Sequence, residues 1–443
     1  MSKYRDNPEA IRALVREDCV HRDVYTDPEL FELEMEHLWR NTWIYVGHAS
    51  QVPRSGDYYT TRIGRTPVIM LRDDEGRVRV LFNRCAHKGT MLVSAPHGHC
   101  EGRVLRCPYH GWTYRLDGSI RTIPLKAGYD GTGFEQAPAS KGIDAAEHVA
   151  EYRGFVFASL AKQGPAFEDY FGESLTSIDN MVDRSPEGRL EVAGGVLRYL
   201  HDCNWKLFVE NLNDTMHPMV AHESAAGTAK KLWAGRSADA PKPMAIEQFL
   251  PFVNGYAFFD KMGVRVYDDG HSYSGVNFSI HSGYSAIGEY ERTMEQAYGA
   301  ERARAILGEV RHNTVYYPSL TIKGAIQAIR VARPIAVDKT LIESWTFRLA
   351  GAPDALLQRT LAYTRLINAP TSMVGHDDRH CYQAIQQGLA SEGNEWVSLH
   401  RNFQPAERER IAGVYHGTSE VAMRGQFRAW SKFMTAAMTP TPS

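Results

Sequence analysis

Two separate stretches of the chain gather side chains that bind metals. The first contains Cys85-x-His87 and, after nineteen intervening residues, Cys107-x-x-His110. Two thiolates and two imidazoles suit either a tetrahedral zinc ion or an iron–sulfur cluster. The C-x-H spacing fits structural zinc sites poorly, because these commonly use C-x(2–4)-C. The pattern therefore favours a cluster that takes one Cys-His pair from each of two loops.

A [2Fe–2S] centre of the Rieske type has this ligand set, with two Cys on one iron and two His on the other. Pro108 would stiffen the second loop. His97, His99 and Cys100 lie between the two pairs and are rival ligands. Their segment, SAPHGHCEG, has no matching partner elsewhere in the chain, so we interpret it as a solvated turn.

The second stretch is 204–222, NWKLFVENLNDTMHPMVAH. Asp214 precedes His217 by one helical turn, so the two side chains share a helix face. His217 and His222 are five residues apart and point in different directions on a regular helix. Pro218 removes a helical hydrogen bond, and a break there would bring both imidazoles to one point. This stretch therefore predicts two ligands of a metal site whose third ligand comes from elsewhere in the chain.

Composition limits the class of protein. The chain has 443 residues and a formal net charge of −2, which indicates two domains and gives no support for nucleic-acid binding. No apolar run is long enough to span a bilayer. The charged N-terminus lacks the apolar centre of a signal peptide, so we expect a cytoplasmic protein that does not bind membranes.

The elements that must position these residues indicate an α+β fold. Residues 1–40 predict N-terminal helices, and Asp27-Pro28 is typical of a helix start. Residues 41–160 predict a small all-β domain, because short β-branched runs alternate with turn signals. Residues 161–443 predict a larger domain of helices and antiparallel strands.

Within the larger domain, each segment has its own expected structure. We expect strands at 190–200, 262–268, 272–281, 326–333 and 340–349, and helices at 166–182, 204–222, 289–312, 353–367, 376–391 and 418–434. Residues 223–245 are interpreted as a loop and 246–260 as a strand.

The set C-A-H…C-P-Y-H-G-W, followed by N-W-K…E-N…D-x-x-H-x-x-x-x-H, resembles the Rieske non-haem iron oxygenases. More narrowly, it resembles the large (alpha) subunit of aromatic-ring-hydroxylating dioxygenases, over nearly the whole chain. One departure is Lys88, where the family commonly has Arg, so the fork-shaped guanidinium is lost.

The resemblance implies a second metal, a mononuclear Fe(II) bound by two His and one carboxylate. Aligning HDDRHCYQAIQQGL on Gly388 assigns the carboxylate to Asp378, with Asp377 as the alternative. The ligands would be His217, His222 and Asp378. The resemblance further implies that Asp214 joins His217 to a cluster histidine of an adjacent subunit, by position His110.

The implied function is that of a terminal oxygenase in aromatic compound catabolism, which uses O2 to hydroxylate a small aromatic substrate. Electrons would come from NAD(P)H through a separate reductase, with or without a ferredoxin, because no G-x-G-x-x-G follows a strand here. A homotrimer, or a hetero-oligomer with a small beta subunit, is expected. The domain order implied is a Rieske domain at 41–160 inside a catalytic domain.

The substrate expected is an aromatic carboxylic acid. A carboxylate requires a buried cation, and Lys323, Arg330 and Arg333 lie in or beside the strand expected at 326–333. The alternative is that these cations are solvated strand ends. Three other functions stay open: a monooxygenase or demethylase on the same scaffold, an electron carrier without a second metal, and a structural zinc module.

Overall fold

The structure is a computed structural model that describes residues 2–237 and 240–436. The chain divides into two compact units, one of Met1–Leu38 with Glu168–Ser443 and the other of Trp39–Phe167. The predicted α+β class, with a small β unit inserted in a unit of helices and antiparallel strands, is confirmed. No helix among the described residues is long and apolar enough to cross a membrane.

Three small antiparallel sheets build the unit Trp39–Phe167. The first has the order β10(His148–Tyr152), β11(Phe155–Ser159), β2(Ile44–His48); the second β5(Val78–Phe82), β4(Thr66–Arg72), β3(Asp57–Ile63), β6(His97–His99); the third β7(Leu105–Arg106), β8(Thr113–Tyr114), β9(Ile120–Thr122). Short 3₁₀ turns join them at Ala49–Gln51, Glu101–Arg103, Lys126–Tyr129, Phe134–Gln136 and Pro138–Lys141. Strand β6 corrects the interpretation of 94–102 as a solvated turn. Its histidines are exposed, but its backbone pairs with β3, and Cys100 is buried in the core.

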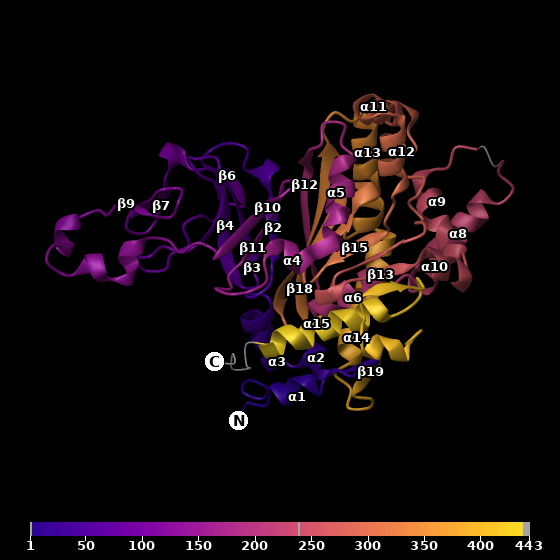
Figure 1. The fold of residues 1–443 in the computed structure, drawn as a ribbon, viewed down its shortest axis with the longest axis horizontal. Helices are drawn as coiled ribbons and strands as arrows, with labels where there is room; N and C mark the ends of the chain where they lie inside the picture. Colours follow the sequence, from indigo (N-terminus) through magenta and orange to yellow (C-terminus); the bar gives the residue numbers. More distant parts are fainter. Residues whose placement is uncertain (1, 238–239, 437–443) are drawn as a thin grey trace. The chain divides into compact units, whose positions relative to one another are not determined.

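An eight-stranded antiparallel sheet forms the centre of the other unit (Figure 1). Its order is β12(Leu190–His201), β18(Lys339–Leu349), β17(Ala328–Ala336), β16(Leu320–Lys323), β15(Asn313–Tyr316), β14(Ser272–Ser274), β13(Val264–Val266), β20(Gly413–Tyr415). The expected strand 272–281 is shorter in the structure, and β15 and β16 were not predicted. A separate pair joins β1(Cys19–His21) to β19(Trp396–Ser398).

This unit also contains helices, several of which pack on the sheet. They are α1(Pro8–Arg12), α2(Asp23–Thr26), α3(Pro28–Leu33) with η1(Glu34–Leu38), α4(Phe167–Phe171), α5(Thr176–Asp183), α6(Trp205–Asn213), α7(Pro218–Ala221), α8(Glu223–Trp233), α9(Met244–Phe249), α10(Tyr256–Met262), α11(Gly288–Tyr298), α12(Ala300–Gly308), α13(Asp354–Tyr363) with η11(Thr364–Asn368), α14(Met373–Gly388) and α15(Val421–Ala436). Shorter turns lie at Gly172–Leu175, Leu250–Val253, Asp268–Gly270, Gly324–Ile326 and Pro405–Arg408. Two predictions are wrong here: 223–245 contains the helix α8, and 246–260 forms helices α9 and α10 instead of a strand.

The register of the sheet decides which side chains face which helices. Lys323 pairs with Ala328 and Thr321 pairs with Arg330, so Lys323 and Arg330 project from the same face of neighbouring strands. Helix α6 packs on β15 and β17, and α13 packs on β18. On the opposite face, Thr314 of β15 contacts Ser177 of α5. The face that carries Lys323 and Arg330 is therefore the one that α6 covers.

Candidate functional site: a mononuclear metal centre and a [2Fe–2S] cluster site

The stretch 204–222 folds as two helices separated by a break. Asn204 caps α6 by accepting a hydrogen bond from the Lys206 N–H at 3.1 Å, and α6 ends at Asn213. Asp214 is extended, and its carboxylate accepts the Met216 N–H at 2.7 Å, which ties the turn. Pro218 then starts α7 at a position where it loses no bond. The break turns His217 and His222 toward one point, as the sequence predicted.

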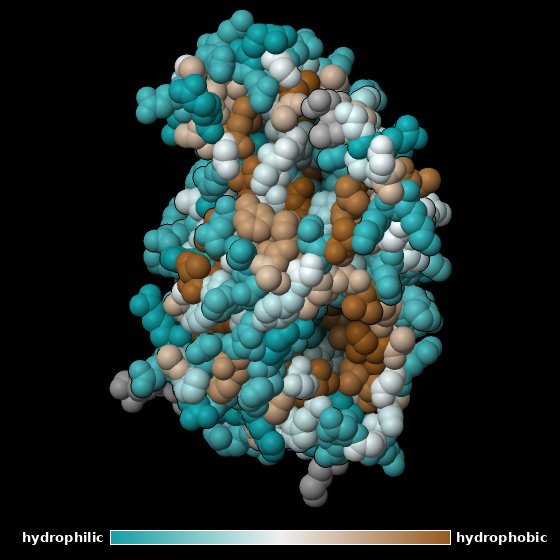
Figure 2. Space-filling view, turned by 90° about the vertical axis from the view of Figure 1, so that its right-hand side faces the viewer, coloured by the Kyte–Doolittle hydropathy of each residue, from teal (hydrophilic) through white to brown (hydrophobic). Residues whose placement is uncertain are grey.

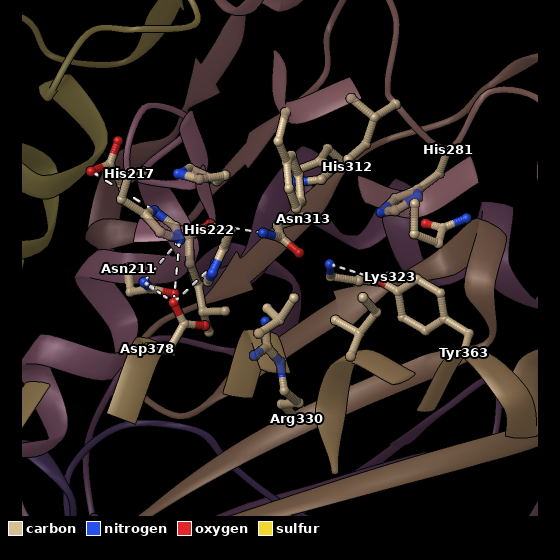
Figure 3. A pocket seen from close by; sticks show the side chains of 18 residues that line it. Asn211, His217, His222, His281, His312, Asn313, Lys323, Arg330, Tyr363 and Asp378 are labelled. Atoms are coloured by element: carbon tan, nitrogen blue, oxygen red, sulfur yellow. Dashed lines mark hydrogen bonds and ion pairs between the residues drawn. The ribbon is translucent and has the colours of Figure 1, made fainter. Parts of the chain in front are cut away.

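His217, His222 and Asp378 converge in the larger unit, Met1–Leu38 with Glu168–Ser443, which is called the catalytic unit below (Figure 3). One donor atom from each lies within 4.8 Å of the other two. The Asp378 Oδ1 atom is 3.6 Å from His217 Nε2 and 3.4 Å from His222 Nε2. Two imidazoles and a carboxylate on one side of a cavity are the donor set of a non-haem Fe(II) site with open positions.

Neighbouring polar groups orient these three side chains. His222 Nδ1 is 3.1 Å from Asp377 Oδ2, so Asp377 contacts the nitrogen that points away from the site. Asn211 donates to Asp378 Oδ1 at 3.4 Å. Burial lowers the pKa of His222, but hydrogen bonds and attraction from Asp378 and Asp377 outweigh it and raise the pKa overall. The arrangement distinguishes the two adjacent carboxylates: Asp378 faces the imidazoles, and Asp377 supports one of them from behind.

Asp214 lies beside His217, but it does not bond to it directly. Its Oδ2 atom is 4.0 Å from His217 Nδ1, which is too long for a hydrogen bond, and that nitrogen is buried without a partner. The Arg401 guanidinium contacts Asp214 Oδ1 at 3.2 Å and also contacts Glu420. Arg401 was not identified from sequence, because nothing local links a residue 187 positions away to this turn.

The cluster residues lie on two loops of the unit Trp39–Phe167 that share one geometry. In the first, Cys85 N–H bonds to Thr90 O and Gly89 N–H bonds to Cys85 O; in the second, Cys107 N–H bonds to Trp112 O and Gly111 N–H bonds to Cys107 O. Gly89 and Gly111 adopt φ of +74° and +70°, a region that favours glycine. The His87 and His110 rings lie 4.6 Å apart.

These loops fit a [2Fe–2S] cluster. Cys85 and Cys107 are buried, and His87 Nδ1 is a buried nitrogen with no hydrogen-bond partner. Burial raises the pKa of Cys107, but hydrogen bonds from the backbone N–H groups of Tyr109 and His110 and from the Cys85 and Thr90 side chains together lower it by more, which favours the thiolate. His97 and His99 belong to β6, where His99 bonds to Asp57, so they are not part of this arrangement.

A cavity extends from the triad along the face of the sheet under α6. The cavity is partly open to solvent. Figure 3 shows the triad at one end and Lys323, Tyr363 and His281 at the other, with Asn313 between them. Of the three cations considered from sequence, Lys323 and Arg330 line the cavity. Arg333 does not, because it bonds to Glu343 at 3.2 Å.

The polar residues His281, His312, Asn313 and Tyr363 in this cavity were not found from sequence. They come from a turn, from the start of β15 and from the end of α13, and no spacing pattern connects them.

Figure 2 shows apolar side chains gathered beside hollows on the face of the catalytic unit that is turned toward the viewer. Exposed apolar residues of this unit include Val220, Leu232 and Met373.

The fold and the two sites define an oxygenase that pairs an iron–sulfur cluster with a mononuclear iron. A family profile described as Rieske [2Fe-2S] domain matches residues 42–138, and one described as ring hydroxylating alpha subunit (catalytic domain) matches residues 190–436. The chain belongs to this family of ring-hydroxylating alpha subunits. It is an oxygen-incorporating oxidoreductase of the Rieske type, with a [2Fe–2S] cluster and a mononuclear iron as cofactors.

Relatives with known names agree with this assignment. The alpha subunit of toluate 1,2-dioxygenase from Pseudomonas putida is 32% identical over 84% of this chain and 79% of its own. The large subunit of anthranilate 1,2-dioxygenase from Acinetobacter baylyi is 32% identical over 89% of this chain and 83% of its own. Naphthalene 1,2-dioxygenase from Rhodococcus has the same fold, with a TM-score of 0.74, 23% identity and coverage of 96% and 95%.

Proposed function

We propose that this oxygenase hydroxylates an aromatic carboxylic acid, and that His217, His222 and Asp378 hold the Fe(II) beside it. The observation that carries the substrate class is the buried amino group of Lys323. Lys323 is 8% exposed, it lines the cavity, and its amino group donates a hydrogen bond to the Tyr363 hydroxyl at 3.1 Å.

No carboxylate of the described residues lies within ion-pair distance of Lys323 or Arg330. Asp378 attracts the Lys323 charge from a greater distance, but its oxygen faces the two imidazoles. Burial and the nearby Arg330 lower the pKa of Lys323 to about 7. A buried cation without a counter-ion is unfavourable, and a substrate carboxylate supplies the missing charge. Relatives named for toluate, anthranilate and 2-halobenzoate support an acidic substrate.

Each cofactor has its own set of residues in this proposal. When bound, the cluster supplies single electrons and the Fe(II) activates O2. Cys85, His87, Cys107 and His110 hold the cluster, and Asp377 and Asn211 orient the iron ligands. Lys323 and Arg330 bind the acid and fix the ring in the cavity.

The electrons come from a separate reductase, with or without a ferredoxin, and pass between subunits of a cyclic oligomer. Asp214 accepts a hydrogen bond from His110 of the partner subunit, and its carboxylate lies 4.0 Å from His217 Nδ1. Two features support this path. His110 is exposed at the tip of its loop, and His217 Nδ1, 4.0 Å from Asp214, has no other partner. A small beta subunit and a cytoplasmic location complete the proposal.

Anaerobic binding of a matched acid and amide tests the substrate class. We expect benzoate to bind the wild-type holoenzyme at least about tenfold more tightly than benzamide, since charge-assisted hydrogen bonds contribute about 1.5–3 kcal/mol. Lys323→Met keeps the length of the side chain and removes its charge, so it should abolish this preference. Lys231→Met, on the exposed side of α8, is the matched control. Equal affinity of wild type for acid and amide contradicts the proposal.

A further inference from the structure

The same cavity contains polar atoms that a simple aromatic acid leaves without partners. His281 is 3% exposed and lines the cavity, and neither of its ring nitrogens has a hydrogen-bond partner. Asn313 is 6% exposed; its NH2 group donates to Leu212 O at 3.1 Å, while its Oδ1 has no partner. Two buried polar side chains therefore face the cavity with unused hydrogen-bonding atoms.

The His281 ring is held firmly in place. It stacks on His312 with 5.0 Å between ring centroids, and the Tyr363 ring meets it edge-on at 5.6 Å. Its backbone N–H bonds to Ser279 Oγ in a turn that a Ser282 N–H to Ser279 O bond closes. The ring nitrogens therefore cannot find partners by a simple rotation of the side chain without breaking the stack.

The protonation of these side chains indicates which hydrogen-bonding group the ligand must supply. Burial, together with repulsion from Lys323 and His312, lowers the pKa of His281 well below its ordinary value, so the ring is neutral. A neutral imidazole has one N–H donor and one bare nitrogen that only accepts. Lys323 and Arg330 supply donors for a carboxylate, and the His281 N–H can add another. The bare nitrogen of His281 and the Asn313 oxygen still need a donor.

We propose that the substrate is an aromatic acid that also carries a hydrogen-bond donor on its ring, a hydroxyl or an amino group, which His281 and Asn313 recognise. This inference rests on the proposed function and narrows its substrate class. Figure 3 shows Asn313 between the triad and Lys323, with His281 next to Tyr363 beyond them. In this view the two acceptors lie on either side of Lys323, the residue proposed to bind the carboxylate.

The donor is selected because an unfilled buried acceptor costs free energy. Leaving a buried polar atom unpaired costs about 1–3 kcal/mol, so filling it strengthens binding by about tenfold or more. A methoxy group in place of hydroxyl has an oxygen but no donor. It cannot bond to either acceptor, and its methyl group excludes the water that would otherwise do so.

Anaerobic calorimetry on the wild-type holoenzyme tests the proposal without turnover. The probes are benzoate, its 2- and 3-hydroxy, 2- and 3-amino and 2- and 3-methoxy derivatives, and benzamide. At least one hydroxy or amino acid should bind about tenfold or more tightly than benzoate, while the methoxy acid of the same position binds no more tightly than benzoate. The hydroxy and amino series identify which donor the site takes.

Variants assign the effect to the two acceptors. His281→Phe keeps the stack on His312 and removes both nitrogens, and Asn313→Leu removes the oxygen. Each should reduce the ratio of donor-acid affinity to benzoate affinity by about tenfold. His400→Phe, at an exposed histidine, is the matched control and should leave this ratio unchanged.

The outcomes separate this inference from the proposed function. If benzoate binds more tightly than benzamide but no hydroxy or amino acid binds more tightly than benzoate, this inference is wrong and the proposed acid substrate is retained. If neither benzoate nor any of its hydroxy or amino derivatives binds more tightly than benzamide, both the proposed function and this inference are wrong. A donor preference that survives intact in both variants overturns the assignment to His281 and Asn313. If a variant does not fold, the hydroxy and methoxy comparison on wild type still decides.

Discussion

At the scale of single residues, the proposed binding of the acid by Lys323 predicts that substrate affinity depends on pH. Its pKa is lowered from 10.5 to about 7 by burial and by Arg330, so the free protein has a charged amino group below pH 7 and a neutral one above. An anionic ligand favours the charged form. We expect the affinity for benzoate to be constant below about pH 7 and to fall by up to tenfold per unit above it.

Calorimetry in buffers of different ionisation enthalpy checks this prediction. Binding at pH 8 should take up a proton, because the carboxylate raises the Lys323 pKa back toward its ordinary value. Benzamide should show neither proton uptake nor a pH trend. Lys323→Met should remove both effects for benzoate, and a proton uptake that persists in this variant would assign the titration to another group.

Asp214 gives a second prediction at this scale. Asp214→Ala should slow product formation by about a hundredfold or more, because a broken electron path limits each turnover, while substrate binding is unchanged. Stopped-flow mixing of the reduced enzyme with substrate and O2 measures the rate. Asp354→Ala, at an exposed carboxylate of α13, is the control. Turnover of Asp214→Ala at the wild-type rate would exclude the bridging role.

The site residues differ in how far each could be predicted from the sequence. Cys85, His87, Cys107 and His110 form a local repeat of two pairs, so spacing alone was informative. Asp378 required the family resemblance, because its distance from His217 along the chain has no local signature. Arg401 and His281 also have no local signature, and the motifs that carry the family resemblance include neither of them. Their roles depend on packing between segments that only the folded chain brings together.

At the scale of elements, α6 is fixed by a buried cluster of charge and hydrogen bonds. Glu34 of η1 is fully buried and accepts from Lys206 Nζ at 2.5 Å, Trp205 Nε1 at 2.8 Å and Trp430 Nε1 at 2.7 Å. Lys206 and Trp205 belong to α6, and Trp430 belongs to α15. This cluster therefore ties the helix that carries Asn211 to both ends of the chain.

Glu34→Gln should destabilise the catalytic unit by about 3–5 kcal/mol, because it leaves the buried Lys206 charge without a partner. Chemical denaturation followed by fluorescence measures the change. The double variant Glu34→Gln with Lys206→Met removes the charge as well and should recover part of the loss. If the single variant is as stable as wild type, the ion pair does not fix α6.

Elements with a clear period were predicted, and those without one were not. Strand β3 alternates between buried and partly buried residues over 57–60, and α15 buries Met423, Phe427, Trp430 and Met434 along one side. Helix α8 was interpreted as a loop because its Ala, Gly and Lys residues give a weak apolar stripe. It is nevertheless helical, because Ala225 and Ala229 pack against Ile246 and Phe249. Tertiary packing outweighed local composition there.

At the scale of the whole molecule, the proposed electron path makes a single chain incomplete. If the cluster of one subunit serves the mononuclear iron of the next, two chains with different defects can complement each other. One chain carries Cys107→Ser and lacks a working cluster; the other carries His222→Ala and lacks a working iron site. Neither forms an active homo-oligomer.

Co-expression of the two defective chains, each with its own affinity tag, should restore activity in doubly purified oligomers. Every cyclic trimer that contains both chains has one iron site in three that combines an intact triad with an intact neighbouring cluster, so about a third of wild-type activity is expected. Wild type co-expressed with a chain that carries both substitutions controls for subunit exchange. Mixed oligomers without activity would mean that electrons stay within one chain. In that case no iron site of a mixed oligomer would receive electrons, because each chain lacks either the cluster or the iron site.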